Sequence, residues 1–559
     1  MIKNSIYSYL KSRLLNSIKN LYDENVLNKV DISIEKPKQK SYGDFSSPVA
    51  LSVAKLVKEN PLDVSKKIMT SFEWNDFFLE PDPLLEKTII NGFINFTVSR
   101  KYLQKNLIDT VFAPQEFGRN QVDRPKRILF EFVSANPTGP MVVVNGRAAA
   151  IGDTLARVNE WIGNKVEREY YINDYGNQIK LLGESIACRF YEKQGKNYPF
   201  PEGGYEGEYI IELAEEISKK HPEVAELSFD QSAEIFSKEA VNIIVEQQKK
   251  ILENYRVKYD NWFRESELHK SKIPQNVVEL LFKKELAYEK DGAIWFKSTL
   301  FGDEKDRVLV RKDKTPTYFL ADLSYHMNKA QRGYDESYTF WGPDHHGYLP
   351  RLEGAVKACN FSNTIFKNFI IQQVNLIRDG KPFKMSKRKG DFITISDLIS
   401  EVGVDAARYF FLMRKLSSHL DFDMTLAVTQ SEKNPVYYVQ YAHARTSSLI
   451  AHAEKQGFSF DDIKSANLDL LNEPEELDIM KRVVDFPILL NQTVELVEPQ
   501  RITSYLETFE SEFHTFYQKH RIVTQNRELS CARLFLTCAV RNILRLGLNL
   551  IGVSAPERM

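Results

Sequence analysis

The apolar and polar positions repeat with different periods along the chain and separate it into three stretches. Early in the chain, apolar residues recur at helical spacing over 10–21 and 48–56, and they alternate at strand spacing over 94–98. Short apolar runs and turn formers fill the middle, whereas long helical periods dominate the last part. We therefore predict a multidomain protein with α/β and all-α parts: an α+β domain over 1–118, an α/β domain over 119–420 and an all-helical domain over 421–559.

The middle stretch opens with a strand, a turn and a helix. Residues 128–133 form an apolar run typical of a buried parallel strand, and the turn formers of 134–140 follow. Helical spacing then continues from Gly146 to Arg157. Because a helix that begins after such a turn points free N–H groups at an anion, this order predicts a nucleotide site. A charged stretch near 182–255 predicts a helical insertion in the same domain.

The composition is that of a folded protein with almost no net charge. Apolar residues make up 43% of the 559 residues, which supports several hydrophobic cores and excludes a disordered chain. Lysine and arginine number 75 against 76 for aspartate and glutamate, so a nucleic-acid partner would need a local basic surface. No segment is long and apolar enough to span a membrane.

The four cysteines lack the close spacing of a zinc site. They are Cys188, Cys359, Cys531 and Cys538. The last two lie in an apolar helical stretch, so we expect them to pack in a core. Scattered free cysteines are typical of a reducing compartment. The first 21 residues predict an amphipathic helix and lack the apolar stretch of a signal peptide. We therefore expect a cytoplasmic protein.

A dense cationic segment, KMSKRKG, occupies residues 384–390. Lysines are mobile point charges that suit the oxygens of a polyphosphate. A bare charge run is more often a solvated surface. Here Phe383 and Met385 interleave with the charges, and residues 391–395 follow with a strand-like pattern. These features favour a phosphate-binding loop.

This segment resembles the KMSKS loop of class I aminoacyl-tRNA synthetases, and further blocks resemble one member of that class. They are "YGDFSSPVALSVAKLVKENP", "NGFINF", "EFVSANPTGP", "YYINDYGNQI", "TYFLADLSYHMNKAQRGYD", "WGPDHHGYLPRL", "NPVYYVQYAHAR" and "GLNLIGVSAPERM". All are similar to blocks of bacterial arginyl-tRNA synthetases and span the three stretches. The resemblance implies a tRNA-contacting N-terminal domain, a Rossmann-like class I catalytic core and a helical anticodon-binding C-terminal domain.

The resemblance implies that ATP is bound between the turn and the cationic loop, with Mg²⁺ arriving on its phosphates. The implied catalytic residues are Lys384, Lys387 and Asn145, and the two lysines would hold the phosphates. The implied ATP-binding residues are Thr138, Gly139, Pro140, Val142, Val144, Asn145, Gly146, Lys384, Met385, Ser386 and Lys387.

The chain departs from the family at its ATP signature. Where the family has His-Val-Gly-His, this chain has Val142-Val143-Val144-Asn145, with matching residues on both sides. Valine donates no hydrogen bond to a phosphate, whereas Asn145 keeps an uncharged amide donor. Val144 also adds a branched side chain where glycine lets the adenine approach the backbone. A milder interpretation is that the valines extend a strand and that ATP is positioned differently.

The candidate arginine site follows from the chemistry of a guanidinium, which pairs best with carboxylates. Tyr318 and Asp322 lie four apart, and therefore on one face if the segment is helical. The resemblance implies that this pair meets the guanidinium, with Glu265 as a second acid. Asp322 as a helix cap and Tyr318 as a core residue are the structural alternatives. Asn136 and Asp344 would fix the amino-acid end, and the full implied set is Ser134, Asn136, Glu265, Tyr318, Asp322 and Asp344.

Two adjacent histidines, His345 and His346, invite a metal interpretation. On a strand they would point to opposite faces and would not easily share one ion. The resemblance gives them packing roles in the active site. We therefore expect no metal held by the protein itself.

The candidate tRNA contacts lie where the helical domain begins. Aromatic faces and donors can stack on unpaired bases and contact their edges. Helical core packing explains part of this set equally well, so we expect RNA contact for only one or two of its members. The set is Tyr437, Tyr441, His443 and Arg445.

The leading hypothesis is an arginine–tRNA ligase that joins arginine and ATP into arginyl-adenylate and then charges tRNA(Arg). The resemblance implies that activation also requires bound tRNA, and we expect a monomer. The alternative is a catalytically impaired, synthetase-like protein that binds tRNA or arginine without efficient charging. The altered signature favours the alternative, whereas the cationic loop and the arginine residues favour the ligase. An unrelated nucleotidyl transferase would not explain the helical domain.

Overall fold

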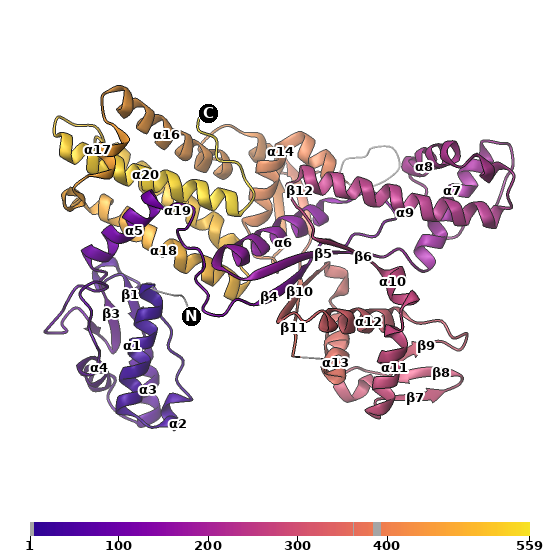
Figure 1. Cartoon of the computed structure of the whole chain (residues 1–559), viewed down its shortest axis with the longest axis horizontal. Helices are drawn as coiled ribbons and strands as arrows, with labels where there is room; N and C mark the ends of the chain where they lie inside the picture. The colour runs from indigo at the N-terminus through magenta and orange to yellow at the C-terminus, as the bar shows by residue number, and fades with distance from the viewer. Residues whose placement is uncertain (1–4, 362, 384–392) are drawn as a thin grey trace.

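The computed structural model describes residues 5–361, 363–383 and 393–559. Figure 1 shows the N-terminal domain and the helical C-terminal domain at one end of the molecule, and the catalytic α/β part with its insertions at the other. This arrangement confirms the predicted combination of an α+β, an α/β and an all-helical part. Among the described residues, no helix is long and apolar enough to cross a membrane.

The N-terminal domain packs helices on a small antiparallel sheet with strand order β1-β3-β2. The predicted helices and the predicted strand are all present, as α1, α3 and β3. A last helix, α5, leaves the domain and packs against α18 and α20. The elements are α1 (Ile6–Leu21), α2 (Glu24–Leu27), β1 (Phe45–Ser47), α3 (Val49–Val57), α4 (Pro61–Thr70), β2 (Ile89–Ile90), β3 (Phe93–Phe96) and α5 (Arg100–Phe112).

A parallel five-stranded sheet with the order β11-β10-β4-β5-β6 forms the core of the α/β part. The strand order reverses between β4 and β10, and ligands of such folds bind outside the carboxyl ends of the strands at this point. The strands are β4 (Arg127–Glu131), β5 (Lys165–Ile172), β6 (Asn261–Arg264), β10 (Glu336–Trp341) and β11 (Ile365–Ile370). The helix α6 (Val143–Ile162) packs against β4 and β5, and α14 (Ile395–Leu412) packs against α6; the other helices of this part are α12 (Tyr318–Gln331) and α13 (Leu349–Cys359).

Two excursions interrupt this core. The predicted helical insertion is a bundle between β5 and β6, made of α7 (Asn177–Glu192), α8 (Glu208–Lys220) and α9 (Phe229–Asn254). Gly183 permits α7 to touch α9, because a Cβ there would lie 2.2 Å from the Ala233 carbonyl oxygen. The second excursion, between β6 and β10, was not predicted. It comprises α10 (Glu265–Lys270), α11 (Ile273–Lys283), β7 (Ala287–Lys290), β8 (Ala293–Phe296) and β9 (Arg307–Val310).

The last part of the chain is helical, and Cys531 and Cys538 are buried in α20 as predicted. A short strand, β14, pairs with β12 of the catalytic part and crosses the predicted boundary at 420/421. We therefore propose that the helical domain begins after α15. The elements are β12 (Val374–Arg378), β13 (Lys381–Pro382), β14 (Leu420–Asp423), α15 (Met424–Val428), α16 (Pro435–Lys455), α17 (Phe460–Lys464), α18 (Pro474–Leu496), α19 (Gln500–Lys519) and α20 (Arg527–Leu550).

Candidate active site

The loop that leaves β4 has strained backbone at the point where the strand order reverses. Val133 and Ser134 both have positive φ angles, of 71° and 41°. A positive φ is a genuine outlier for a β-branched residue such as valine, and such strain persists only where the surroundings hold it. The Ser134 hydroxyl accepts a hydrogen bond from the backbone N–H of Tyr171 at 3.1 Å, which ties the turn to β5.

The turn that follows is held by the helical insertion. The Tyr209 hydroxyl on α8 donates a hydrogen bond to the Thr138 carbonyl oxygen at 2.8 Å. A Cβ at Gly139 would lie only 3.3 Å from that hydroxyl. A Cβ at Gly146 would lie 2.2 Å from the Ile395 side chain, so this glycine lets α6 pack against α14. The structure thus brings Thr138, Gly139 and Gly146 to one end of the sheet.

The altered signature forms the first turn of α6, and it is a helix where the milder interpretation had a strand. Val142 is the N-cap residue, and its backbone N–H donates to the Asn145 Oδ1 atom at 2.9 Å. Val142 and Val144 are half-buried, whereas Val143 points into the core with 8% of its surface exposed. Asn145 therefore caps the helix with its oxygen, which leaves the amide nitrogen as its donor.

The segment after the cationic loop lies against the altered signature. Thr394 forms a β-bridge with Val142, and the Ile395 N–H donates to the Met141 carbonyl oxygen at 2.9 Å. The predicted strand over 391–395 is wrong for its described part, because Thr394 makes only this bridge and α14 begins at Ile395. Lys384, Met385, Ser386 and Lys387 lie outside the described residues.

A cavity of about 300 Å³ lies at the carboxyl ends of β4 and β10. It collects most of the residues predicted to bind arginine: Ser134, Asn136, Glu265, Tyr318 and Asp322. Tyr318 and Asp322 lie one turn apart on α12, as their spacing predicted. The Thr317 hydroxyl begins this helix by accepting from the Leu320 N–H at 3.4 Å. Asp344 does not line the cavity, and its side chain is 78% exposed beside His345.

Asp322 is a buried carboxylate whose proton affinity is unusual. Its pKa is raised to about 7, chiefly by burial and also by the nearby carboxylates of Glu265 and Glu131, while the hydrogen bond from Tyr348 opposes the rise. The Tyr348 hydroxyl donates directly to Asp322. Glu265 is 4% exposed and lies 3.2 Å from the His269 Nε2 atom. The cavity therefore concentrates negative charge that a cationic ligand would neutralise.

A third acid in the cavity, Glu131, is already neutralised. The fully buried Lys329 donates to its carboxylate and also to the Thr339 hydroxyl at 3.1 Å. His326 supplies no competing charge, because burial lowers its pKa to about 3. Its Nδ1 atom lies 2.8 Å from the Asp322 carbonyl oxygen. Asp322 and Glu265 are thus the two acids left for a guanidinium, which pairs with carboxylates in a planar, bidentate way.

The sequence did not single out several residues that complete the cavity. Asn173 lies between two predicted residues: its amide is 3.1 Å from the Tyr318 hydroxyl and, when oriented to suit its neighbours, donates to Glu265 at 3.0 Å. Tyr348 and Asn173 belong to the quoted blocks "WGPDHHGYLPRL" and "YYINDYGNQI", so those blocks carried the only available signal. Further polar residues that line the cavity and were not predicted are Glu131, Tyr171, Tyr325 and His326.

The adjacent histidines do not lie on a strand. His345 ends a short 3₁₀ turn, Pro343–His345, and its ring lies 4.9 Å from that of Trp341. His345 lines the cavity, which fits a packing role. Within 5–361, 363–383 and 393–559, no group of three histidine, cysteine, aspartate or glutamate side chains is placed to hold a metal ion.

The candidate tRNA contacts on α16 separate into a partly exposed group and a buried residue. Tyr437 and Tyr441 stack with ring centroids 6.5 Å apart, and Arg445 donates to the Tyr441 hydroxyl at 2.7 Å. His443 is 1% exposed, and its Nδ1 atom lies 2.8 Å from the Pro556 carbonyl oxygen. Burial lowers the pKa of His443, so the ring is a neutral core group. We correct the expectation accordingly and leave His443 out of the candidate RNA surface.

If Asp322 binds arginine, as expected from the sequence, its raised pKa makes that binding depend on pH. With a pKa of about 7 in place of 3.8, the empty site binds a proton that the unfolded chain releases near pH 4. A guanidinium needs the charged form, so that proton must leave when arginine binds. We expect the dissociation constant for arginine to rise roughly tenfold per pH unit below about 7 and to level off above it. Calorimetric titration at pH 6, 7 and 8 measures this, and a constant affinity would contradict it.

The same shift has a consequence for stability. A carboxyl whose pKa is raised on folding adds most to the stability of the folded state when the pH is below its pKa in the unfolded chain, which is 3.8. This contribution to stability is lost as the pH rises through about 7, the pKa in the folded state. The empty site is therefore least stable when Asp322 is charged. Arginine should stabilise the fold more strongly at pH 8 than at pH 6, which thermal melting with and without arginine detects.

Comparisons with known proteins match all three parts of the chain. The family models are described as "Arginyl tRNA synthetase N terminal domain" over residues 8–98, "tRNA synthetases class I (R), catalytic domain" over 108–424 and "DALR anticodon binding domain" over 439–559. The arginine–tRNA ligase of Thermotoga petrophila is 40% identical over 98% of this chain and 99% of its own length. That of Bacillus subtilis is 40% identical over 95% and 94%.

A solved structure shares the whole architecture. The arginyl-tRNA synthetase of Thermus thermophilus superimposes with a TM-score of 0.78 over 99% of this chain and 100% of its own. Because the two sequences are only 19% identical, this likeness shows a shared fold and nothing about function. The catalytic family model covers more than half of the chain, and curated relatives match it at about 40% identity over nearly its full length. The chain therefore belongs to the arginyl-tRNA synthetase family.

Proposed function

We propose that this protein is an arginine–tRNA ligase. The observation that carries the proposal is the pair of acids Asp322 and Glu265, neither of which pairs with a lysine or arginine that the structure describes, in a cavity at the point where the strand order reverses. Their charge and planar shape complement a guanidinium. Tyr318 and Asn173 at the mouth would exclude water from the pair and orient the side chain. A neutral or acidic amino acid would leave the buried acids without a partner, which costs affinity.

The first chemical step joins arginine to ATP. The arginine carboxylate attacks the α-phosphorus, the bond to the pyrophosphate oxygen breaks, and arginyl-adenylate forms. The cavity would hold the guanidinium, and Ser134 and Asn136, which also line it, would contact the amino-acid end of the substrate. The ribose at the 3′ end of tRNA then attacks the activated carbonyl, and AMP leaves. The protein contributes positioning and charge stabilisation, so no covalent enzyme intermediate is needed.

ATP would lie between the turn at Thr138–Pro140 and the cationic loop. Lys384 and Lys387 would hold the phosphates, and Mg²⁺ would arrive with ATP, since it usually binds through substrate phosphates. Asn145 would replace part of the missing signature. Its oxygen is occupied by the Val142 N–H, which directs the amide nitrogen to act as a donor. An amide carries no charge, so we expect slower activation than with two histidines.

The tRNA would contact all three domains. Tyr437, Tyr441 and Arg445 combine partly exposed aromatic faces with a guanidinium, and they suit stacking on unpaired bases. We propose that the protein acts as a monomer in the cytoplasm, where tRNA charging takes place and where four unpaired cysteines are stable.

Charging of tRNA with labelled arginine tests the proposal. We expect acid-precipitable label to accumulate on tRNA(Arg) in the presence of ATP and Mg²⁺. Lysine and citrulline should fail, because lysine lacks the planar fork and citrulline lacks the charge. Tight binding of tRNA without any charging would instead support the alternative, an impaired synthetase-like protein, to which the altered signature points.

A further inference from the structure

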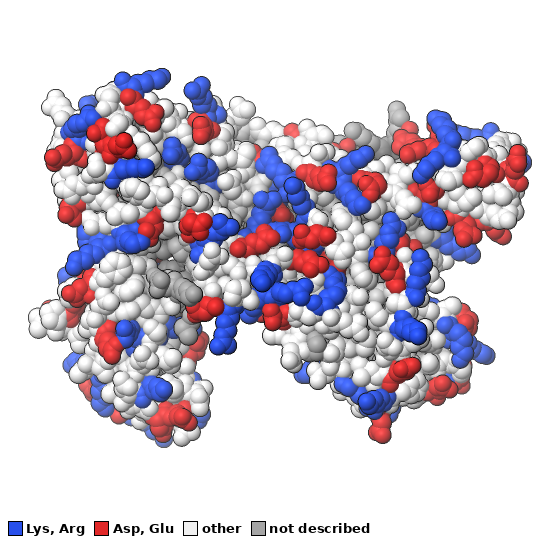
Figure 2. All heavy atoms as spheres, in the orientation of Figure 1, with Lys and Arg blue, Asp and Glu red and all other residues white. Residues whose placement is uncertain are grey.

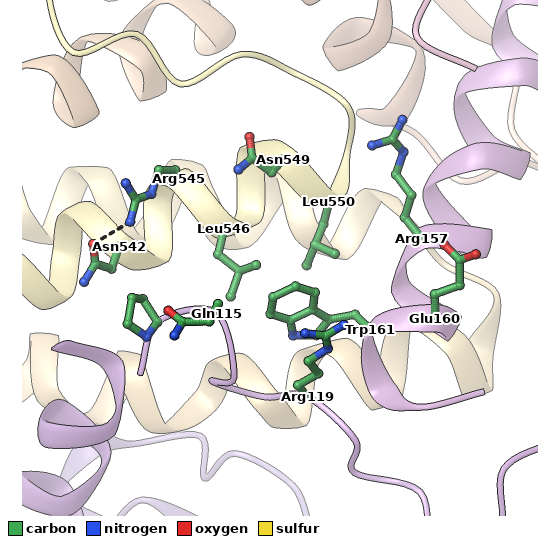
Figure 3. Close-up of a pocket in the computed structure, with 11 residues that line it drawn as sticks. Gln115, Arg119, Arg157, Glu160, Trp161, Asn542, Arg545, Leu546, Asn549 and Leu550 are labelled. Carbon is green, nitrogen blue, oxygen red and sulfur yellow. Dashed lines mark hydrogen bonds between the residues drawn. The ribbon is translucent and has the colours of Figure 1, made fainter. Parts of the chain in front are cut away.

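A second cleft lies far from the arginine cavity, where the three domains meet. It has a volume of about 450 Å³ and is formed by the segment after α5, the last turns of α6 and the last turns of α20. Figure 3 shows Trp161 facing Leu546 and Leu550 across the cleft, with Arg119 beside the indole and Arg545 on α20. Binding pockets for small ligands span roughly 300–1,000 Å³, so the cleft has room for one nucleotide.

Positive charge predominates around this cleft. Its one carboxylate, Glu160, is held by two hydrogen bonds of 2.7 Å from Arg168 and is therefore already neutralised. The Arg157 Nε atom lies 2.7 Å from the Asp153 Oδ2 atom, but the buried Arg408 also forms an ion pair with this oxygen, at 2.6 Å. One acid thus faces two guanidiniums, and the excess charge remains available to an anion.

Arg545 is the cleft residue that lacks a counter-ion. Its guanidinium donates to the Asn542 Oδ1 atom at 3.1 Å, and it forms no ion pair with any residue that the structure describes. Burial and then the neighbouring Arg541 lower its pKa, and Glu557 offsets only part of this effect, so the surroundings do not fully compensate its charge. A phosphate would supply the missing partner in a bidentate geometry.

The opposite wall offers a flat surface suited to a base or a ribose. The Trp161 Nε1–H donates to the Phe117 carbonyl oxygen at 3.1 Å, which fixes the ring, and the Arg119 guanidinium lies 5.2 Å from its centroid. Aromatic rings and guanidinium planes are the surfaces on which proteins stack RNA bases. The side-chain amides of Gln115 and Asn549, both exposed, make no hydrogen bond with the described part of the chain. They remain free to meet base edges.

We propose that this cleft binds one nucleotide of the tRNA, with its phosphate on Arg545 and the base or ribose against Trp161 and Arg119. The proposal rests on the proposed function and adds a contact at the centre of the complex. Because the cleft is lined by both α6 and α20, an RNA bound to the catalytic and helical domains together could reach it. Figure 2 shows Lys and Arg side chains gathered across the middle of one face, between the helical bundle and the sheet, with acidic side chains among them.

Two substitutions in the full-length protein test the cleft. Arg545→Gln removes the charge that lacks a counter-ion, and Arg119→Ala removes the exposed guanidinium that lies beside the Trp161 ring. The control is Arg311→Ala, since Arg311 is exposed near β9 and, among the described residues, its side chain donates hydrogen bonds only to Thr315 and Pro316. The dissociation constant for tRNA(Arg) is measured from 50 to 300 mM salt, and thermal melting checks the fold. We expect Arg545→Gln to weaken binding roughly tenfold or more.

The salt dependence separates a phosphate contact from a structural defect. Loss of one phosphate contact should lower the slope of log Kd against log salt by about 0.7–0.9 for Arg545→Gln, with the control unchanged. If the unmodified protein binds tRNA(Arg) and both cleft variants bind it with the same affinity and the same salt dependence, the proposal is overturned and the proposed function still stands. Weaker binding of AMP alone, with tRNA binding unchanged, would also overturn it. Failure of the wild-type protein to bind tRNA would overturn both.

Discussion

Replacing Asp322 with asparagine is expected to raise the KM for arginine by two to three orders of magnitude. Removing one partner of a buried charge pair costs about 2–5 kcal/mol, and the remaining Glu265 cannot neutralise the guanidinium in the same geometry. Asparagine has nearly the same shape and can still accept the hydrogen bond from Tyr348. The loss should therefore fall on arginine and leave the KM for ATP close to wild type.

Arginine-dependent ATP–pyrophosphate exchange with tRNA present gives both KM values. Asp313→Asn is a matched control, because Asp313 is exposed in the loop before α12 and bonds to Thr315. Stability offers a second check: removing a carboxyl whose pKa is raised to about 7 should leave the empty variant at least as stable as wild type at pH 8. An unchanged KM for arginine in a folded variant would exclude Asp322 from the guanidinium site.

Restoring the ATP signature should produce the second large effect, and in the opposite direction. The triple substitution Val142→His, Val144→Gly, Asn145→His returns two phosphate donors and removes the branched side chain near the adenine. One transition-state donor is worth about 2.7–4 kcal/mol, or roughly 10²–10³ in rate. Because donors that act on one group are not additive, we expect kcat/KM for ATP to rise on the order of 10²- to 10⁴-fold.

This gain should come with a small loss of stability. The Asn145 oxygen caps the Val142 N–H at 2.9 Å, and losing a cap costs about 0.5–2 kcal/mol. Glycine in the first turn of α6 costs up to about 1 kcal/mol more. Asn145→Asp is the informative companion, because it keeps the capping oxygen and loses the donor. That variant should melt like wild type yet exchange more slowly, and a triple variant no faster than wild type would show that the valines do not limit activation.

Local patterns in the sequence predicted the parts of the fold that depend on near neighbours. Helical spacing predicted α1 and α6, and the apolar run predicted β4, because those periods report which face is buried. The same reasoning placed Tyr318 and Asp322 on one helical face. The same reasoning was wrong at residues 393–395, where residue types that favour strands predicted a strand. The helix α14 begins there instead, and Ile395 packs against Gly146.

The rest of the site depends on contacts between distant segments. The neutralisation of Glu131 by Lys329 spans nearly 200 residues, and the Tyr348 bond to Asp322 joins two helices that only the fold brings together. The burial of His443 likewise depends on the chain end, since its partner is Pro556. Aromatic and basic residues look alike in sequence whether they face RNA or a core, so only the packing separated His443 from Tyr437 and Arg445.

The central claim is that the cavity around Asp322 and Glu265 activates arginine despite the altered signature. The most direct measurement is ATP–pyrophosphate exchange by the wild-type protein with tRNA(Arg) present, with and without arginine. We predict exchange that depends on arginine, lies above background and, at an arginine concentration near the wild-type KM, falls by about two orders of magnitude in Asp322→Asn. Exchange at background level with arginine, ATP, Mg²⁺ and tRNA all present would contradict the claim and leave a protein that binds its ligands without joining them.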